Sequence, residues 1–224
     1  MHKIKGIFVS TLLLLSLLAI IAPVSAGTIH VYPGDDLEAI VEAAPAGSTI
    51  YVHAGTYILV DDIRIGQDNI TLIGDGATTT IIERDLDAVP GPSMLIGIDG
   101  VKNVTITGFT FKNSNDSAIY LETSTANATI SNNIIVDGSY RGILGWNNVT
   151  GTIKNNLILR CAYHGISVRS NVTIINNSVI SCKGGGIYID NGADATIKNN
   201  IIVSNETFGI GADLGGGNPI INIE

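Results

Sequence analysis

The side chains of this sequence that could do acid–base chemistry are concentrated in its C-terminal half. Arg169, Asp190 and Asp213 follow one another at nearly equal intervals, and His164 lies shortly before the arginine. Two carboxylates and a base in one groove could cleave a polysaccharide, and stacked carboxylates could bind Ca²⁺. Alternatively, Arg169 and Asp190 form a plain ion pair on a solvated surface. The choice depends on whether the fold brings the four residues together.

Aromatic residues occur in the same part of the chain. Trp146 is the single tryptophan, and Tyr120 and Tyr188 occupy other copies of the repeat described below. Aromatic faces beside polar groups bind sugar rings. We therefore expect these three residues to bind carbohydrate, provided that they share an exposed face.

A short repeat of nearly constant length must position these side chains. Its first motif reads VTITGFTF, ATISNNII, GTIKNNLI, VTIINNSV and ATIKNNII, with threonines at Thr105, Thr129, Thr152, Thr173 and Thr196. A second motif in phase with the first reads SAIYL, RGILG, HGISV, GGIYI and FGIGA. Apolar residues alternate with period two, Gly and Asn mark the turns, and no helical period is present. The repeat therefore predicts a solenoid of parallel strands.

Two columns of glycine and asparagine follow from the alignment of these copies. The first column holds Gly74, Gly108, Asn132, Asn155, Asn176 and Asn199. Gly and Asn both tolerate left-handed backbone angles, so this column predicts a sharp bend. The next column holds Asn133, Asn156, Asn177 and Asn200, with Phe109 one turn earlier. At the spacing of neighbouring strands, about 4.8 Å, these amides are expected to form a structural hydrogen-bonded ladder.

Alternation in the second motif predicts which side chains face solvent. The core positions are Ile119, Ile143, Ile166, Ile187 and Ile210. The outward columns are Ser117, Arg141, His164, Gly185 and Phe208, then Tyr120, Leu144, Ser167, Tyr188 and Gly211, and then Glu122, Trp146, Arg169, Asp190 and Asp213. All candidate binding and catalytic residues therefore fall on one outer face.

Two cysteines are expected to form a structural disulfide. Cys161 and Cys182 lie at the same distance before the Gly of the second motif, on neighbouring turns. Their Cα atoms should be about 5 Å apart, which a disulfide can span, and a secreted chain permits oxidation. Two free thiols are the alternative.

The N-terminal segment has the pattern of a secretory signal. Lys3 and Lys5 precede an apolar run over residues 7–22, and small residues follow up to Ala26. The run is shorter than the roughly 20 apolar residues of a membrane span. We therefore predict a signal peptide over 1–26 and one domain over 27–224, secreted or at the cell surface and touching the membrane only through this segment.

Both ends of the predicted solenoid need covering. At the N-terminal end, apolar residues recur at helical spacing at Leu37, Ile40, Val41 and Ala44. This pattern predicts a short helix, capped by Asp35 or Asp36, that covers the open core. A longer loop is expected over 85–93. At the other end, GGGNPIINIE begins a further repeat, which we interpret as a truncation or as an end covered by another subunit or by further repeats.

The charge of the chain limits its partners. Past residue 26 there are 10 basic and 20 acidic residues, a net charge of −10. A nucleic-acid binder needs a basic face, so that class is excluded. No cofactor is required, and Ca²⁺ at Asp190 and Asp213 is the ion that the acidic residues would accept. Sequons that would make the chain a glycoprotein begin at Asn69, Asn103, Asn115, Asn127, Asn148, Asn171, Asn176 and Asn205.

Taken together, the motifs resemble the pectin-lyase-like superfamily. IVEAAPAGSTIYVHAGTY, from Ile40, is followed by ITLIGDG and by the asparagine-bearing repeats. Within that superfamily the chain is similar to right-handed β-helix repeat proteins of archaeal and bacterial surfaces, including NosD-type repeats. The resemblance implies an all-β, right-handed parallel β-helix of about seven turns with a short N-terminal capping helix.

The resemblance also bears on activity. YHGISV, from Tyr163, is similar to the polygalacturonase motif G-H-G-I-S-I. However, Arg141 stands where the preceding turn of those enzymes carries a carboxylate, and their other signatures are missing. Copper, which NosD-type proteins suggest, would need clustered ligands. The ligands past residue 26 are scattered over the turns, at His30, His53, Met94, His164, Cys161 and Cys182.

Two functions follow as expectations. The first is a non-catalytic surface protein that binds a polysaccharide or surface glycan through Tyr120, Trp146 and Tyr188. The alternative is a polysaccharide lyase or glycoside hydrolase. Its candidate residues are Arg169, Asp190, Asp213 and His164. Enzymes of that kind place such residues on long loops, and the turns of this chain are short.

Overall fold

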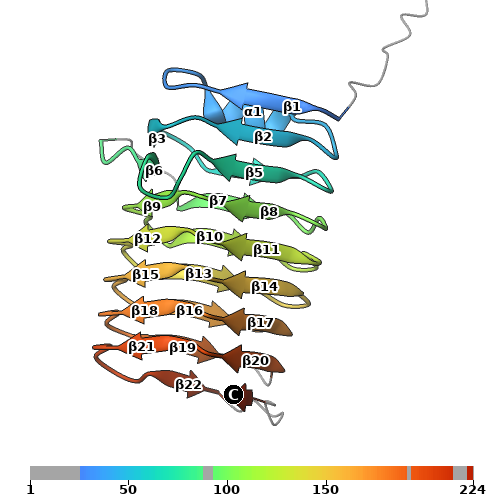
Figure 1. The fold of residues 1–224 in the computed structure, drawn as a ribbon. Helices are drawn as coiled ribbons and strands as arrows, with labels where there is room; N and C mark the ends of the chain where they lie inside the picture. Colours follow the sequence, from blue (N-terminus) through green and yellow to red (C-terminus); the bar gives the residue numbers. More distant parts are fainter. Residues whose placement is uncertain (1–25, 88–92, 191–192, 214–220, 224) are drawn as a thin grey trace, which may run out of the picture.

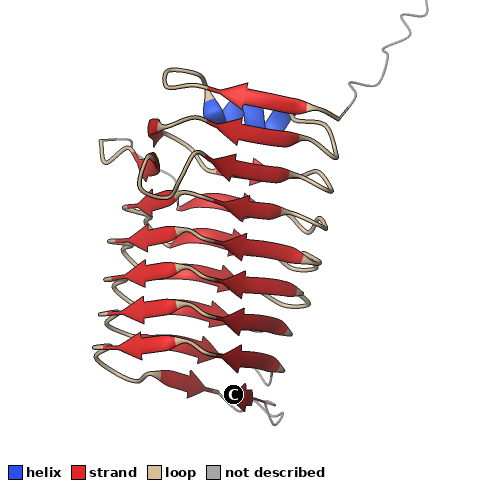
Figure 2. Ribbon diagram, in the orientation of Figure 1, coloured by secondary structure: helices blue, strands red, loops and turns tan. Residues whose placement is uncertain are grey.

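A computed structural model of the chain describes residues 26–87, 93–190, 193–213 and 221–223, which form one parallel β-solenoid (Figures 1 and 2). Three sheets run along its axis. The first sheet has nine strands in the order β1 (Thr28–Val31), β2 (Thr49–Val52), β5 (Thr71–Gly74), β8 (Thr105–Thr107), β11 (Ala128–Ser131), β14 (Gly151–Lys154), β17 (Val172–Ile175), β20 (Ala195–Lys198) and β23 (Ile221–Ile223).

The other two sheets have seven strands each. The second consists of β3 (Gly55–Leu59), β6 (Thr80–Arg84), β9 (Thr110–Lys112), β12 (Ile134–Val136), β15 (Leu157–Leu159), β18 (Ser178–Ile180) and β21 (Ile201–Val203). The third consists of β4 (Ile63–Ile65), β7 (Met94–Ile98), β10 (Ser117–Leu121), β13 (Arg141–Gly145), β16 (His164–Val168), β19 (Gly185–Ile189) and β22 (Ile210–Ala212). With the partial turns at its ends the solenoid has about eight turns, so the predicted coil is confirmed.

Like positions of the repeat stack above one another. Thr129 of β11 pairs with Thr105 of β8 and with Thr152 of β14, and the column continues through Thr173 and Thr196. Each copy of the sequence repeat is therefore one turn of the solenoid. Every column read from the repeat is then a line of residues along the axis.

The inward column of the third sheet is a buried stack of isoleucines. Ile119, Ile143, Ile166 and Ile187 pair in register and expose no surface. Ile210 of β22 is half-buried and packs against the same core. Burying such a side chain contributes roughly 1.5–3 kcal/mol to stability. The inward residues predicted from the second motif are therefore confirmed.

The second asparagine column forms the expected ladder. We call its members, Asn133, Asn156, Asn177 and Asn200, the asparagine ladder. The side-chain amide of Asn133 donates to Asn156 Oδ1 at 3.3 Å, and the next two steps are 3.0 Å each. Each Oδ1 also accepts a backbone N–H from the turn before, beginning with that of Phe109. The amides therefore replace backbone pairing at the corner between the first and second sheets.

The residue before each ladder member makes the bend. Asn132, Asn155, Asn176 and Asn199 have φ angles of 54°, 55°, 56° and 53°, and Gly108 has 86°. These left-handed angles confirm the predicted bend. Gly74 is required for space instead, because a Cβ added there would lie 2.3 Å from the carbonyl oxygen of Gly108.

A strand and a helix close the N-terminal end. The carboxylate of Asp36 caps α1 (Leu37–Ala43) by accepting the backbone N–H of Ala39 at 3.0 Å. Leu37 and Val41 are buried in the core, and Figure 1 shows α1 beside β1 and β2 at this end of the solenoid. The predicted capping helix is confirmed. The preceding strand β1 was not expected, because its alternating pattern covers only the short stretch Thr28–Val31.

The structure holds Cys161 and Cys182 as free, fully buried thiols rather than as the expected disulfide. The strands on either side pair in register, so the two residues lie one above the other on neighbouring turns. Stacked Cβ atoms are about 4.8 Å apart, whereas a disulfide needs about 3.8 Å. A hydrogen bond between the thiols raises the pKa of Cys161 and lowers that of Cys182.

Some predicted segments lie outside the described residues. These are the signal peptide apart from Ala26, part of the loop expected over 85–93, and most of the C-terminal repeat. Within the described residues, no helix has both the length and the apolar character that a membrane span needs.

Candidate functional site

The outer face of the third sheet carries the candidate residues. Tyr120 pairs with Leu144, and the same column continues through Ser167, Tyr188 and Gly211. An outward direction does not make every residue accessible, because large neighbours cover the small ones. Ser117, Leu144, His164 and Ser167 are buried although they point away from the core.

A hollow of about 260 Å³ opens on this face. We call it the third-sheet pocket. It is lined by Arg141, Leu144, Trp146, Tyr163, His164, Ser167, Arg169, Tyr188, Asp190 and Asp213. All four residues with candidate acid–base roles therefore meet in one place, together with two of the three predicted sugar-binding aromatics. Tyr120 does not line the pocket, but its ring packs edge-on against Trp146 with the centroids 6.4 Å apart.

Arg169 is fixed between two partners. Its Nε donates a hydrogen bond to Asp190 Oδ2, and its guanidinium lies 4.0 Å over the ring of Trp146. The ion pair that the repeat predicted is therefore present. A protonated guanidinium cannot accept a proton, so Arg169 in this arrangement acts as a cation and not as a base.

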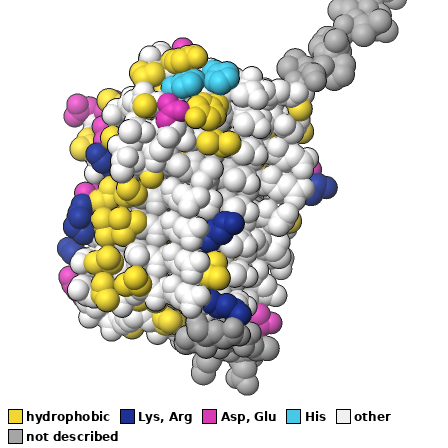
Figure 3. All heavy atoms as spheres, in the orientation of Figure 1, with side chains coloured by type: hydrophobic (Ala, Val, Ile, Leu, Met, Phe, Trp, Pro, Cys, Tyr) yellow, Lys and Arg dark blue, Asp and Glu magenta, His cyan; other side chains and the backbone are white. Residues whose placement is uncertain are grey.

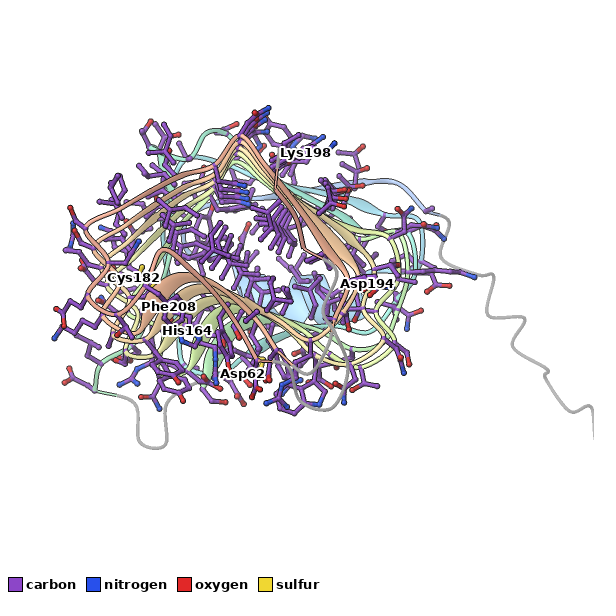
Figure 4. The ribbon with its side chains drawn as sticks, turned by 90° about the horizontal axis from the view of Figure 1, so that it is seen from below. Asp62, His164, Cys182, Asp194, Lys198 and Phe208 are labelled. Carbon is purple, nitrogen blue, oxygen red and sulfur yellow. The ribbon has the colours of Figure 1, made fainter. Side chains whose placement is uncertain are left out.

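An aromatic stack borders the pocket and spans four turns. We give this name to Tyr140, Tyr163, His164, Tyr188 and Phe208. The rings of Tyr140 and Tyr163 lie 4.6 Å apart and nearly parallel, and the ring of His164 lies 3.8 Å from that of Tyr163. Tyr188 and Phe208 follow at 4.6 and 5.4 Å from the imidazole. Figure 4, a view along the axis, shows His164 and Phe208 side by side at one corner of the solenoid.

Sequence reasoning missed Tyr140 and Tyr163 as members of this site. Both lie in turns, directly before Arg141 and His164, and so outside the strand columns that the repeat displays. The available signal was that the two tyrosines are separated by one repeat length, which is one turn of the solenoid.

The positively charged guanidinium of Arg141 packs against the tyrosine at one end of the aromatic stack. Its guanidinium lies 4.1 Å from the ring centre of Tyr140, and its Nη1 contacts Asp116 Oδ1 at 3.3 Å. Its Nε is buried without a hydrogen-bond partner. A guanidinium at this position cannot supply the carboxylate that polygalacturonase chemistry requires.

His164 is held neutral. Only 3% of its surface is exposed, and burial together with the nearby charge of Arg141 lowers the pKa of its imidazole to about 4. Its Nδ1 is buried and has no hydrogen-bond partner. An unpaired buried polar atom costs roughly 1–3 kcal/mol, and native proteins keep few of them.

The aromatic side chains in the pocket remain partly accessible. Trp146 and Tyr188 are half-buried rather than exposed, and their binding of carbohydrate stays a prediction. Burial and the charges of Asp190 and Asp213 raise the pKa of Tyr188. Its hydroxyl therefore stays protonated and can donate a hydrogen bond.

The carboxylates of this face are mostly engaged. Asp190 is paired with Arg169. One turn before Trp146, Glu122 is paired with Arg64, whose guanidinium also contacts Asp99 at 3.0 Å. Among the described residues, no group of three or more His, Cys, Asp or Glu side chains could hold a metal ion. Binding of Ca²⁺ at Asp190 and Asp213 stays a prediction.

A second cluster that sequence reasoning missed lies near the cap. His30 and His53, expected to be scattered, meet on the outer face of the first sheet with Nδ1 of His30 3.0 Å from Nε2 of His53. Asp75 lies beside them. The two histidines are 23 residues apart, close to the length of one turn, and this spacing was the signal that could have placed them on neighbouring turns, although they do not share a column.

Comparison with known proteins identifies the fold as a right-handed β-helix. A family model described as a right-handed beta helix region matches residues 69–223. Comparison with curated proteins finds no match. Among solved structures, the chain is similar to pectin methylesterase PemA from Erwinia chrysanthemi, at 14% identity and a TM-score of 0.55, over 77% of this chain and 64% of that one.

Two further structures have the same architecture. A pectin methylesterase in complex with a hexasaccharide has 14% identity and a TM-score of 0.56, over 82% of this chain and 66% of that one. The PL6 family alginate lyase AlyGC has 13% identity and a TM-score of 0.54, over 89% of this chain and 39% of that one. The chain spans less than two thirds of each neighbour's length. At these identities the likeness concerns the fold alone.

Proposed function

The chain belongs to the right-handed β-helix family, and we propose that within this fold it serves as a non-catalytic carbohydrate-binding protein of the cell exterior. The binding site is the third-sheet pocket, and the ligand is a polysaccharide or surface glycan. One observation carries the proposal: Trp146 and Tyr188 line the same hollow as Arg169, Asp190 and Asp213.

The chemistry of this lining suits a sugar. Apolar faces of sugar rings pack on aromatic rings, while hydroxyl groups need fixed donors and acceptors nearby. The Tyr188 hydroxyl supplies a donor, and Asp190 and Asp213 supply acceptors. Arg169 covers one side of Trp146 at 4.0 Å, which holds the indole in one orientation before a ligand arrives. A site organised in advance loses less entropy on binding.

The fold itself is compatible with such a ligand. One of the similar structures is a pectin methylesterase in complex with a hexasaccharide, so the β-helix of that protein accommodates an oligosaccharide. We carry only the class of ligand over to this chain. The non-catalytic role is supported by the pairing of Asp190 with Arg169 and by the low pKa of His164, which make both of these residues poor bases.

A lyase or hydrolase is the second candidate. The observation that favours it is that Arg169, Asp190, Asp213 and His164 line one pocket, which is the arrangement that the enzyme hypothesis required. A substrate that displaced Asp190 from Arg169 would free a carboxylate for acid–base work.

One experiment separates the two candidates. The protein is screened on a glycan array with and without Ca²⁺, and the glycans that bind are then incubated with it and analysed for cleavage. Binding without products supports the proposal. Products that disappear in Asp190→Asn would establish the enzyme instead, and no binding to any glycan would overturn both. Tyr32→Ala, at an exposed tyrosine near the cap, is the control.

A further inference from the structure

Two histidines from neighbouring turns meet on the outer face of the first sheet. His30 lies on β1, and His53 follows β2 directly. Nδ1 of His30 and Nε2 of His53 are 3.0 Å apart, and Figure 3 shows the histidine side chains gathered at the cap end of the molecule. One of these nitrogens carries a proton that the other accepts.

The second ring nitrogen of His53 also has a partner. Its Nδ1 lies 3.4 Å from Asp75 Oδ2, and the ring of Tyr32 stacks on it with the centroids 4.3 Å apart. Asp75 in turn accepts the backbone N–H of Ala54 at 2.8 Å. A hydrogen bond from the hydroxyl of Tyr51, followed by that backbone bond, lowers the pKa of Asp75, so it is an anchored anion at neutral pH.

We propose that His30 and His53 bind a divalent transition-metal ion of the kind that imidazole ligates, with Asp75 orienting His53. Metal–imidazole bonds are about 2.0–2.1 Å long, so two nitrogens on one ion lie roughly 2.8–3.4 Å apart, depending on the coordination geometry. The observed separation of 3.0 Å falls within this range. A carboxylate on the second ring nitrogen is also the arrangement that orients metal-binding histidines.

Binding requires a change of tautomer at His30. The ion takes the place of the proton between the two nitrogens, that proton is transferred by way of solvent to the other ring nitrogen of His30 so that both imidazoles stay neutral, and the exposed His30 ring tilts so that both lone pairs point at the metal. The chain supplies two ligands, so water or a donor from another molecule completes the coordination. This agrees with the finding that the described residues contain no group of three or more such ligands.

The test uses protein purified without a polyhistidine tag. Zn²⁺ affinity is measured by competition with a chromophoric chelator, and Cu²⁺ is added for electron paramagnetic resonance, in which nitrogen couplings count the bound imidazoles. We expect His30→Ala and His53→Ala each to weaken Zn²⁺ binding at least tenfold. Asp75→Asn keeps both imidazoles and should weaken it by about 10- to 100-fold.

Lys154→Ala is the matched control. Lys154 follows His30 in the same outward column, several turns along the first sheet, so its loss should leave the affinity unchanged. Equal binding by the wild type and the double variant H30A/H53A would overturn the proposal and leave the pair as a hydrogen bond between turns. The wild-type resonance spectrum gives an answer even if a variant fails to fold, because a signal with fewer than two nitrogens also contradicts the site.

Discussion

The asparagine ladder and the aromatic stack run through the same turns of the solenoid, yet they are built on different principles. The side-chain amides of Asn133, Asn156 and Asn177 each donate to the amide oxygen of the next turn, so these positions need a side chain that both donates and accepts. The aromatic stack joins tyrosine, histidine and phenylalanine from strand and turn positions. Ring faces need only contact one another, so the residue type is free to vary.

This difference separates stability from recognition. Asn133, Asn156 and Asn177 of the ladder are buried and bond to other turns, so a change at any of them affects neighbouring turns as well. The stack borders the third-sheet pocket on the outer face, where variation would change ligand binding under the function proposed above. In this solenoid the residues that repeat from turn to turn form the interior, and the residues that differ between turns lie on the outer face.

The largest effect is expected in the middle of the ladder. Asn156→Ala removes the acceptor of the Asn133 side-chain amide and backbone N–H and the donor to the carbonyl of Ile130, and it leaves Asn177 Oδ1 with only the backbone N–H of residue 156. At roughly 1–3 kcal/mol for each abandoned buried partner, the free energy of unfolding should fall by about 3–5 kcal/mol. Urea denaturation followed by circular dichroism measures it.

The neighbouring residue is the control for that loss. Asn155 has an exposed side chain and a φ of 55°, so Asn155→Gly should stay within about 0.5 kcal/mol of the wild type. A cost below about 1 kcal/mol for Asn156→Ala would mean that the ladder is an outcome of the fold and not a support for it.

The next effect depends on pH and concerns His164. Its pKa is about 4 in the folded protein and about 6.5 in an unfolded chain. As the pH falls from 6.5 to 4, the imidazole of His164 therefore binds a proton in the unfolded state but not in the folded state. Stability should fall through this window by up to about 3 kcal/mol and level off below pH 4.

Other carboxylates titrate in the same range, so the comparison is made with His164→Gln. The variant should lose less stability than the wild type between pH 6.5 and 4, measured by urea denaturation at each pH. Parallel curves for the two proteins would show that the imidazole is not held neutral by its surroundings.

A smaller effect on stability, with a clear effect on binding, is expected at Tyr188. Tyr188→Ala removes a half-buried ring from the pocket and should weaken glycan binding about tenfold, equivalent to about 1.4 kcal/mol. Tyr188→Phe keeps the ring and should lose less affinity. The difference between the two variants separates the contribution of ring stacking from that of the hydroxyl. Isothermal titration with a glycan found on the array gives both values. Equal affinities for all three proteins would place the ligand elsewhere.

The same division explains what the sequence could predict. The coil, the bend, the asparagine ladder and the isoleucine core were predicted because each repeats one residue type at one position. The outward columns also predicted that Arg169, Asp190 and Asp213 share a face. The burial of His164 could not be predicted, because it depends on the sizes of Tyr163 and Tyr188 around it.

Two other misses concern how neighbouring turns stack. The His30–His53 pair joins residues that are not directly paired: His30 is in register with Tyr51, two positions before His53. Alignment of columns therefore does not display it. The disulfide between Cys161 and Cys182 was predicted because the two residues stack on neighbouring turns. Stacking places their Cβ atoms about 4.8 Å apart, which is more than a disulfide needs.

The smallest effect is predicted for that cysteine pair. Because Cys161 and Cys182 are free thiols in the structure, a reducing agent should leave the free energy of unfolding unchanged. A disulfide closing a loop of this length would stabilise the protein by about 3 kcal/mol, so the two outcomes are well separated. The measurement is urea denaturation with and without dithiothreitol, and Cys161→Ala/Cys182→Ala serves as the control that cannot respond. Thiol labelling should also proceed only after unfolding, because both side chains are fully buried. A loss of stability on reduction, absent from the double variant, would show that the coil relaxes enough to bring the sulfur atoms together, and the interior would then be less regular than the ladder implies.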